Sequence, residues 1–285
     1  MMAIFYFFFT KFIYIMPMIK HYRIGISSTL DYSVPIERLF EIFSKTGYDF
    51  ISLGADMEHS NYLRSDKFHK ILDLSKSLSL KIESVHIPFG KSYNIANINK
   101  SLQRKAMNAI DKFMLLTNQY QIPTVIIHPH HYFPDSRDNC LFRARDALQE
   151  ILSLKPKNIQ MAVENLPTDD GSWICAGILD RLDKSQVGFC YDSSHENMSG
   201  RPFHLLEKYF SRLTTSHLSD NHGNFDEHLV PQDGTIDWNG LKSYFDRSDI
   251  DHILLEVGTG APLSLPIERV AKIAYERAQR IFNED

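Results

Sequence analysis

The sequence predicts an α/β protein that folds into a single (β/α)₈ TIM barrel. Short β-rich runs alternate with longer segments of helical periodicity along the chain. Most of the short runs are apolar throughout, which is typical of strands buried on both faces of a parallel sheet. The length of 285 residues suits one barrel, and no Pro-, Gly- or Ser-rich linker divides it.

Eight strands and the helices between them are expected. The strands cover residues 23–27, 50–53, 82–86, 124–128, 160–164, 187–192, 213–219 and 252–256. The clearest helical patterns cover residues 35–46, 100–120, 141–152, 202–210 and 266–282. In the first of these helices, Ile36, Leu39 and Phe43 share one face, and Pro35 occupies a tolerated first-turn position. Eight strands that alternate with helices close naturally into a barrel.

An open, doubly wound sheet is the alternative architecture. Its first strand would be followed by a Gly-rich phosphate-binding loop, and the residues IGISS at 24–28 do not form such a loop. The sequence therefore favours the closed barrel.

Composition and charge exclude several classes of protein. Hydrophobic residues make up 43% of the chain and charged residues 23%, so the chain is not disordered and has enough apolar residues for a large core. The net charge is −4 and there is no Lys/Arg run, which argues against a nucleic-acid-binding tail. Cys140, Cys175 and Cys190 include no CxxC pair, so we expect neither disulfides nor a thiolate zinc site, and we expect a cytoplasmic protein.

The first 18 residues, MMAIFYFFFTKFIYIMPM, differ from the rest because they are strongly apolar. They lack the early positive region and the cleavage site of a signal peptide, and they are short for a membrane span. We interpret residues 1–18 as an extension upstream of a mis-assigned start, with the barrel over 19–285 and translation beginning at Met16 or Met18. The alternative is a genuine hydrophobic anchor. No membrane association is expected once this segment is discounted.

Nine ionisable side chains stand at the ends of the last six predicted strands or in the loops that follow. They are His86, His128, Glu164, Asp192, His195, His217, Asp226, His228 and Glu256. In a barrel these positions converge on the carboxyl face, where catalytic residues gather. Clustered carboxylates repel one another unless a cation neutralises them, and imidazole with carboxylate is a usual ligand set for Zn²⁺, Mn²⁺ or Mg²⁺. The sequence therefore predicts a site for one to three divalent ions, with a purely structural polar network as the alternative.

The order of these residues resembles the xylose isomerase-like TIM barrel superfamily, which contains sugar-phosphate isomerases and epimerases and the endonuclease IV group. The resemblance covers residues 22–282, and its most specific stretch is HLSDNHGNFDEHLVPQDGTIDW at 217–238. It implies that Glu164, Asp192, His217 and Glu256 match a four-ligand metal site. It also implies that Glu164 and Glu256 move protons on the two faces of a substrate, and that His195 contacts the substrate. In endonuclease IV all nine positions bind a cluster of three zinc ions.

Three functions follow from this resemblance. The first, which we favour, is a sugar or sugar-phosphate isomerase or epimerase, in which the metal lowers the cost of forming an enediolate. The second is an endonuclease IV-like zinc phosphodiesterase acting at abasic DNA sites; the loops STLDYSVP and ADMEHSNYL after the first two strands lack the basic residues that DNA would need. The third is a non-catalytic metal-binding barrel. The expected partner is a small sugar, no other cofactor is expected, and self-association into a homo-oligomer is left open.

Other side chains are candidates for supporting roles. Lys91, Arg137 and Arg201 would hold a substrate phosphate, although each is more often a solvated surface charge. Asn165, Asp220 and Asn221 would orient the metal ligands. Trp173 is a candidate to stack on a sugar, with packing as the simpler interpretation, and Trp238 is expected to pack at the start of a helix.

Overall fold

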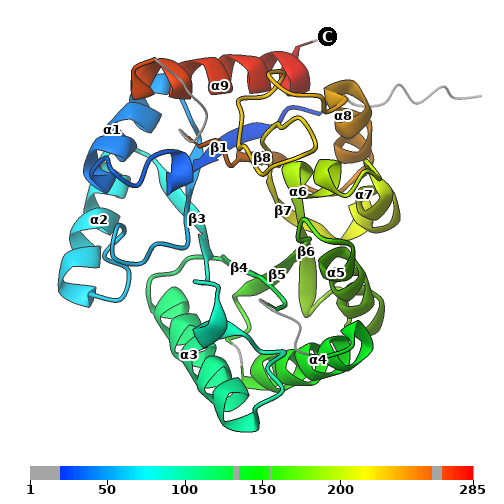
Figure 1. Cartoon of the computed structure of the whole chain (residues 1–285). Helices are drawn as coiled ribbons and strands as arrows, with labels where there is room; N and C mark the ends of the chain where they lie inside the picture. Colours follow the sequence, from blue (N-terminus) through cyan, green and yellow to red (C-terminus); the bar gives the residue numbers. More distant parts are fainter. Residues whose placement is uncertain (1–19, 131–134, 155, 259–264, 285) are drawn as a thin grey trace, which may run out of the picture.

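Eight parallel strands form the centre of the molecule. The computed structural model describes residues 20–130, 135–154, 156–258 and 265–284. The strands are β1 (Arg23–Ser27), β2 (Phe50–Leu53), β3 (Lys81–His86), β4 (Thr124–Ile127), β5 (Gln160–Glu164), β6 (Val187–Asp192), β7 (Leu213–His217) and β8 (His252–Leu255). Figure 1 looks into the ring that they form. The predicted (β/α)₈ barrel is confirmed.

The ring closes between β7 and β8. Hydrogen-bonded neighbours follow the order β7-β6-β5-β4-β3-β2-β1-β8, so β1 pairs with both β2 and β8. At the remaining seam, the N–H of Leu218 donates to the carbonyl of Leu254, and the N–H of Glu256 donates to the carbonyl of Leu218, both at 3.0 Å. These two bonds bring β8 beside the end of β7. The open-sheet alternative is therefore excluded.

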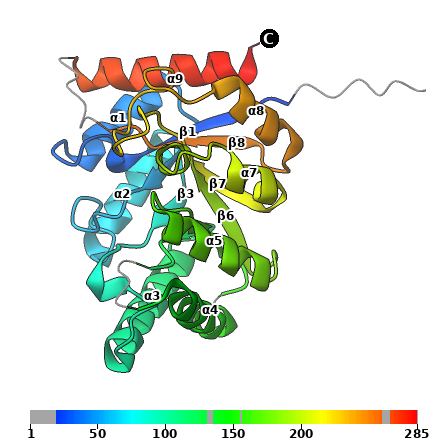
Figure 2. The ribbon, with the colours of Figure 1, turned by 45° about the vertical axis from the view of Figure 1, so that its right-hand side comes forward.

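Helices form the outer layer of the barrel (Figure 1). They are α1 (Ile36–Thr46), α2 (Ser65–Ser77), α3 (Lys100–Gln119), α4 (Arg137–Leu154), α5 (Asp169–Arg181), α6 (Ser193–Met198), α7 (His204–Tyr209), α8 (Trp238–Arg247) and α9 (Ile267–Asn283). Pro35 is the N-cap of α1 rather than its first residue, and Gly47 ends that helix with a left-handed φ of 104°. Figure 2 shows the helices packed along the outer side of the strands.

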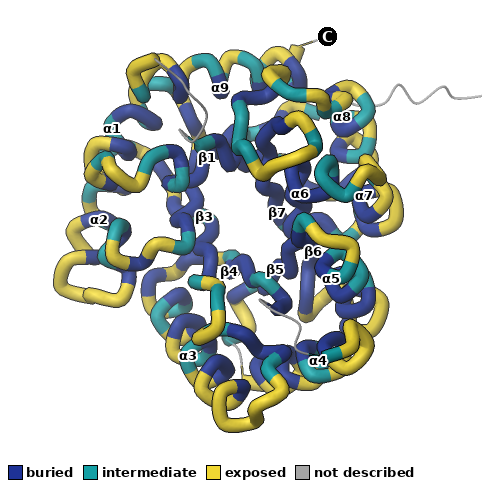
Figure 3. Tube along the Cα trace, in the orientation of Figure 1, coloured by how far each residue is buried: buried dark blue, intermediate teal, exposed yellow. Residues whose placement is uncertain are grey.

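The core has two parts. The larger lies between the strands and the helices, and Figure 3 shows buried residues along the strands and the inward sides of the helices. The smaller consists of Ile126, Ala162 and Cys190 inside the barrel. Glu164 follows Ala162 by two positions and Asp192 follows Cys190 by two, so these pairs share the inward face of β5 and β6. An apolar layer therefore lies one step below the polar residues at the carboxyl end.

Several strands and helices begin or end at other residues than predicted. Strands predicted over 124–128, 213–219 and 252–256 end one or two residues earlier, which places His128 and Glu256 just past the strand ends. Helix α4 begins at Arg137 instead of residue 141, because its polar first turn carries no apolar periodicity. The apolar segment 1–18 lies outside the described residues. Among the residues that are described, no helix combines the length and apolarity needed to span a membrane.

Candidate metal centre and active site

Four side chains from neighbouring strand ends meet at the carboxyl end of the barrel. Glu164 ends β5, Asp192 ends β6, His217 ends β7 and Glu256 follows β8. One potential ligand atom from each lies within 4.8 Å of the others, and all four residues are buried. We call these four residues the ligand set. The family resemblance implied these four as a metal-binding set, and the structure brings them together.

Two atoms of the ligand set lack hydrogen-bond partners. His217 Nδ1 lies 3.1 Å from Glu164 Oε2 and 3.1 Å from Glu256 Oε2, but it makes no hydrogen bond with acceptable geometry. Asp192 Oδ2 is also buried without a hydrogen-bond partner. An unsatisfied buried polar atom costs about 1–3 kcal/mol, and more when it is charged. These two atoms are therefore free to act as ligands to a cation held between the four residues.

The charges of the ligand set are poorly balanced by protein groups. Burial raises the pKa of the Asp192 carboxyl to about 7, and the nearby carboxylates of Glu164 and Glu256 act in the same direction. Burial would lower the pKa of His217, but the nearby carboxylates of Glu256 and Glu164 outweigh it and hold that pKa well above its ordinary value. Three carboxylates are therefore crowded around one imidazole. A divalent cation would offset the repulsion between the carboxylates.

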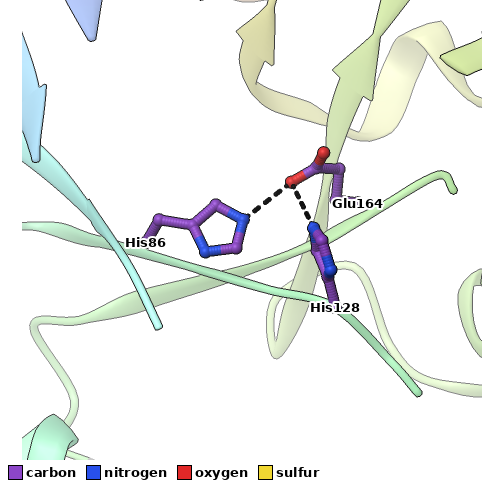
Figure 4. A group of neighbouring side chains, drawn as sticks. All are labelled: His86, His128 and Glu164. Atoms are coloured by element: carbon purple, nitrogen blue, oxygen red, sulfur yellow. Dashed lines mark hydrogen bonds and ion pairs between the residues drawn. The ribbon is translucent and has the colours of Figure 1, made fainter. Parts of the chain in front are cut away.

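Two further histidines, His86 and His128, approach the Glu164 carboxylate (Figure 4). His86 Nε2 lies 3.0 Å and His128 Nε2 lies 3.5 Å from Glu164 Oε2. The Nδ1–H of His86 donates to the carbonyl of Ile87 at 2.6 Å, and its Nε2 is hydrogen-bonded to the Glu164 carboxylate. Burial lowers the pKa of His128, which favours a neutral ring there. These two histidines and Glu164 form a second group whose ligand atoms lie within 4.8 Å of one another.

The other three predicted residues bond to one another. Asp226 Oδ2 lies 3.2 Å from His195 Nε2 and 3.1 Å from His228 Nε2. The Nδ1–H of His195 donates to the carbonyl of Asn165 at 2.8 Å, and the Nδ1–H of His228 donates to the carbonyl of Glu256 at 2.7 Å. We call His195, Asp226 and His228 the bridged trio. Within the described residues, the trio is not among the groups whose ligand atoms all lie within 4.8 Å of one another.

A cavity of about 520 Å³ opens above these residues, a size typical of small-molecule sites. It is lined by Thr29, Tyr32, Ala55, Asp56, His86, Pro88, Phe89, His128, Glu164, His195, Asp226, His228, Glu256 and Gly258. No Lys or Arg is among these described lining residues. Sequence reasoning missed Tyr32, Asp56 and Phe89, because aromatic and acidic residues in loops carry no spacing signal. Phe89 stacks on His128 with ring centroids 4.5 Å apart.

The expected phosphate-binding residues lie away from this cavity. Arg201 pairs with Asp169 at 3.0 Å. Arg137 lies over the ring of Trp173 at 4.9 Å, so Trp173 packs beside α4 rather than over the ligand set. Trp238 is buried at the start of α8, as expected. Lys91 does not line the cavity either.

The chain is similar to known proteins over most of its length. A family model described as xylose isomerase-like TIM barrel matches residues 40–278. The uncharacterized protein y4fM of Sinorhizobium fredii is 36% identical over 89 residues, which cover 30% of this chain and 29% of the relative. The uncharacterized protein MJ1311 of Methanocaldococcus jannaschii is 23% identical over 229 residues, which cover 76% of each chain.

Solved structures share the fold. A D-tagatose 3-epimerase-like protein superposes with a TM-score of 0.76 at 20% identity, covering 92% of this chain and 98% of its own. D-psicose 3-epimerase in the presence of D-fructose gives 0.74 at 14% identity, with 92% and 100% covered. The IolI protein with a bound zinc atom gives 0.73 at 15% identity, with 92% and 98% covered. At these identities the likeness establishes the barrel and leaves the chemistry to be argued from the site.

Proposed function

Because this chain belongs to the xylose isomerase-like TIM barrel family, we propose that it is a divalent-metal-dependent isomerase or epimerase of sugars. The observation that carries this proposal is the ligand set, with its unsatisfied Asp192 Oδ2 and His217 Nδ1 below a cavity of small-molecule size. Structures of sugar 3-epimerases with the same fold support the choice of substrate class.

The donor set fits a divalent cation. Three carboxylates and one imidazole are ligands that Zn²⁺ and Mn²⁺ accept, and Mg²⁺ accepts carboxylates. The two unsatisfied atoms, Asp192 Oδ2 and His217 Nδ1, belong to this set and would gain a partner. When bound, the ion would supply Lewis-acid polarisation of a substrate carbonyl group.

Proton transfer falls to the two glutamates. Glu164 and Glu256 both line the cavity and come from strands that are separated by β6 and β7 in the ring. They therefore reach a bound sugar from different sides. One carboxylate removes a carbon-bound proton and the other returns a proton on the opposite face, which inverts that carbon; return to the neighbouring carbon would give isomerisation.

The charge of the cavity favours an unphosphorylated sugar. Among its described lining residues, Asp56, Glu164, Asp226 and Glu256 are acidic and none is Lys or Arg. A phosphate in this space would face carboxylates without a Lys or Arg side chain among the described lining residues to balance it. Tyr32 and Phe89 instead offer aromatic surfaces of the kind that pack on the apolar face of a sugar ring.

A screen of sugars on metal-loaded protein tests the proposal. The protein would be stripped with a chelator, reloaded with Mn²⁺, Zn²⁺ or Mg²⁺, and incubated with free ketoses and with their phosphate esters. We expect metal-dependent conversion of a free ketose and little conversion of its ester. Conversion that survives complete removal of metal would contradict the metal-dependent mechanism, and a preference for the ester would contradict the charge argument.

A second candidate function is a zinc phosphodiesterase that acts at abasic DNA sites. The observation in its favour is the group of His86, His128 and Glu164, which offers a second metal-binding set sharing one carboxylate with the first (Figure 4). Two or more zinc ions per chain, together with incision of abasic-site DNA, would establish this activity in place of the first. A chain that is inactive in both assays would be a non-catalytic metal-binding barrel.

A further inference from the structure

Asp220 is a buried carboxylate at the start of the loop that contributes Asp226 and His228 to the cavity wall. It lies three residues after His217, and it begins the segment 220–237 that connects β7 to α8, which we call the strap. Asp226 and His228 both belong to the strap. The Asp220 residue is completely shielded from solvent. A fully buried carboxylate needs several donors to offset the loss of its hydration.

Four N–H groups supply those donors. Asp220 Oδ1 accepts from the main-chain N–H of Asn221 at 2.9 Å and from that of Ile236 at 3.2 Å. Asp220 Oδ2 accepts from the main-chain N–H of Gln232 at 3.0 Å and from Nε1–H of Trp238 at 2.8 Å. These donors come from the beginning and the end of the strap and from the first residue of α8. One side chain therefore ties together segments that are 18 residues apart in sequence.

The main chain of Asp220 adds a second tie. Its N–H donates to the carbonyl of Leu229 at 2.8 Å, and its carbonyl accepts from the N–H of Leu229 at the same distance. This pair closes a short loop that contains Asp226 and His228. Because His228 is the neighbour of Leu229, the position of its ring depends on this closure. Its Nδ1–H then reaches the carbonyl of Glu256 at 2.7 Å.

Gly234 provides the space for this arrangement. A Cβ atom at this position would lie 2.3 Å from the carbonyl oxygen of Asn221 and 2.3 Å from Asp220 Oδ1. Such distances are far inside van der Waals contact, so a side chain at 234 would force the strap away from Asp220. Only glycine lets the returning chain pass this close to the carboxylate.

We propose that Asp220 is a positioning residue that fixes the strap and so places Asp226 and His228 for substrate recognition, without supporting metal binding. The residues of the ligand set stand on or directly after strands β5 to β8, and none of them bonds to the Asp220 side chain. The strap meets the ligand set at the main-chain carbonyl of Glu256, which accepts from His228, and not at a potential ligand atom, so we expect strap order and metal affinity to be separable. The recognition part of this inference rests on the proposed sugar chemistry, whereas the fixing of the strap does not.

Chymotrypsin cleavage after Phe225 measures strap order without any substrate. Phe225 is 74% exposed at the tip of the strap, so cleavage there reports how often the strap opens locally. In the full-length protein, Asp220→Asn keeps the size of the side chain but replaces one carboxylate oxygen by an NH2 group. This donor then faces N–H groups that have lost their acceptor. We expect cleavage after Phe225, identified by mass spectrometry, to accelerate at least about tenfold, since the substitution removes charge-assisted hydrogen bonds that hold the strap. Zinc affinity is expected to stay within about threefold of the wild type, in contrast to the larger losses seen when groups that orient ligands are removed.

Three further variants show whether faster cleavage comes from the loss of the Asp220 contacts. Gly234→Ala should accelerate the same cleavage by displacing the strap from the other side. Trp238→Phe removes a single donor and should give a smaller effect, which keeps the test informative if Asp220→Asn fails to fold. Asp237→Asn is the matched control, because Asp237 only caps α8 through the N–H of Gly240. It should leave the cleavage rate unchanged.

The outcomes separate this inference from the proposed function. Cleavage after Phe225 that is unchanged in both Asp220→Asn and Gly234→Ala, or that rises equally in Asp237→Asn, would overturn it. So would a loss of zinc affinity that parallels the gain in cleavage. If the sugar screen succeeds, Asp220→Asn should raise KM by about tenfold with a smaller change in kcat. If the screen fails while cleavage responds as expected, the strap inference stands and the sugar chemistry falls.

Discussion

The ligand set and the bridged trio contain the same kinds of residue in one cavity, but their polar atoms are satisfied differently. The ligand set stands at strand ends and leaves Asp192 Oδ2 and His217 Nδ1 without hydrogen bonds. The trio stands on α6 and the strap, and both nitrogens of His195 and His228 have partners. The difference indicates that the ligand set could hold a cation, whereas the polar atoms of the trio already have partners within the protein.

The largest effect is expected from Glu256→Gln, which removes one ligand charge and one proton-transferring carboxylate. On the proposed mechanism, kcat/KM for the converted sugar should fall about 10³-fold. Steady-state kinetics on metal-loaded protein would measure it. Glu268→Gln, an exposed surface change on α9, is the matched control and should behave like the wild type. Activity in Glu256→Gln within about tenfold of the wild type would remove this residue from the chemistry.

A change in the trio should affect substrate and metal differently. Asp226→Asn removes the carboxylate that joins His195 and His228, and we expect KM to rise about tenfold because charge-assisted hydrogen bonds are lost. Metal affinity should change little. Isothermal titration with Zn²⁺ and kinetics with sugar would compare the two quantities, with Asp233→Asn on the outer side of the strap as control. A large loss of zinc affinity in Asp226→Asn would place the trio in the metal site.

Glu196 also has a buried side-chain oxygen without a hydrogen-bond partner, but it belongs to none of the potential metal-binding groups among the described residues. Its Oε2 lacks a hydrogen-bond partner, and burial raises the pKa of this carboxyl to about 7. The folded protein therefore holds a proton there between about pH 4.5 and 7 that the unfolded chain releases, so this group lowers the free energy of unfolding as pH rises through that window.

Glu196→Gln should abolish the fall in the free energy of unfolding that this carboxyl causes as pH rises. Relative to the wild type, the variant should gain about 2 kcal/mol of unfolding free energy between pH 5 and pH 8. Urea unfolding at the two pH values would measure the difference. An equal effect of the substitution at both pH values would show that the carboxyl does not take up a proton on folding.

The smallest effect is expected at the cavity mouth. Phe89 stacks on His128 but is 55% exposed, so Phe89→Ala removes an aromatic wall without touching the ligand set. We expect a rise in KM of about threefold, since an aromatic contact of this kind is worth about 0.5–1.5 kcal/mol. Phe142→Ala, an exposed position on α4, is the control. An unchanged KM in Phe89→Ala would mean that the substrate does not contact this wall.

The barrel could be predicted because its pattern is periodic and local. Buried parallel strands are apolar throughout, and every strand candidate was found within two residues of its observed end. The boundaries that failed are those without an apolar signal, such as the start of α4 at Arg137. Helix α6 escaped notice because six residues are too few for a face to repeat.

The gathering of the site was predictable for a different reason. Residues at successive strand ends of a barrel must converge, so the gathering of the nine polar residues followed from the fold, whereas the choice of Glu164, Asp192, His217 and Glu256 came from the family resemblance. The hydrogen-bond partners of the individual side-chain atoms could not be predicted from the fold. The bridge through Asp226 and the four donors to Asp220 depend on the path of the strap, and that path is set by close approaches such as the one at Gly234. Nothing in residue spacing reports which N–H group will reach a buried carboxylate.

The metal content of the wild type and of Asp226→Asn is the most direct test of the contrast between the ligand set and the bridged trio. Each protein would be stripped, reloaded with Zn²⁺, freed of excess ion by gel filtration, and analysed for zinc per chain. We predict one zinc ion per chain in both, because the ligand set, alone of the potential metal-binding groups among the described residues, contains two polar atoms without hydrogen-bond partners. Two or three ions in the wild type, with at least one lost in Asp226→Asn, would contradict this account and favour the multinuclear phosphodiesterase.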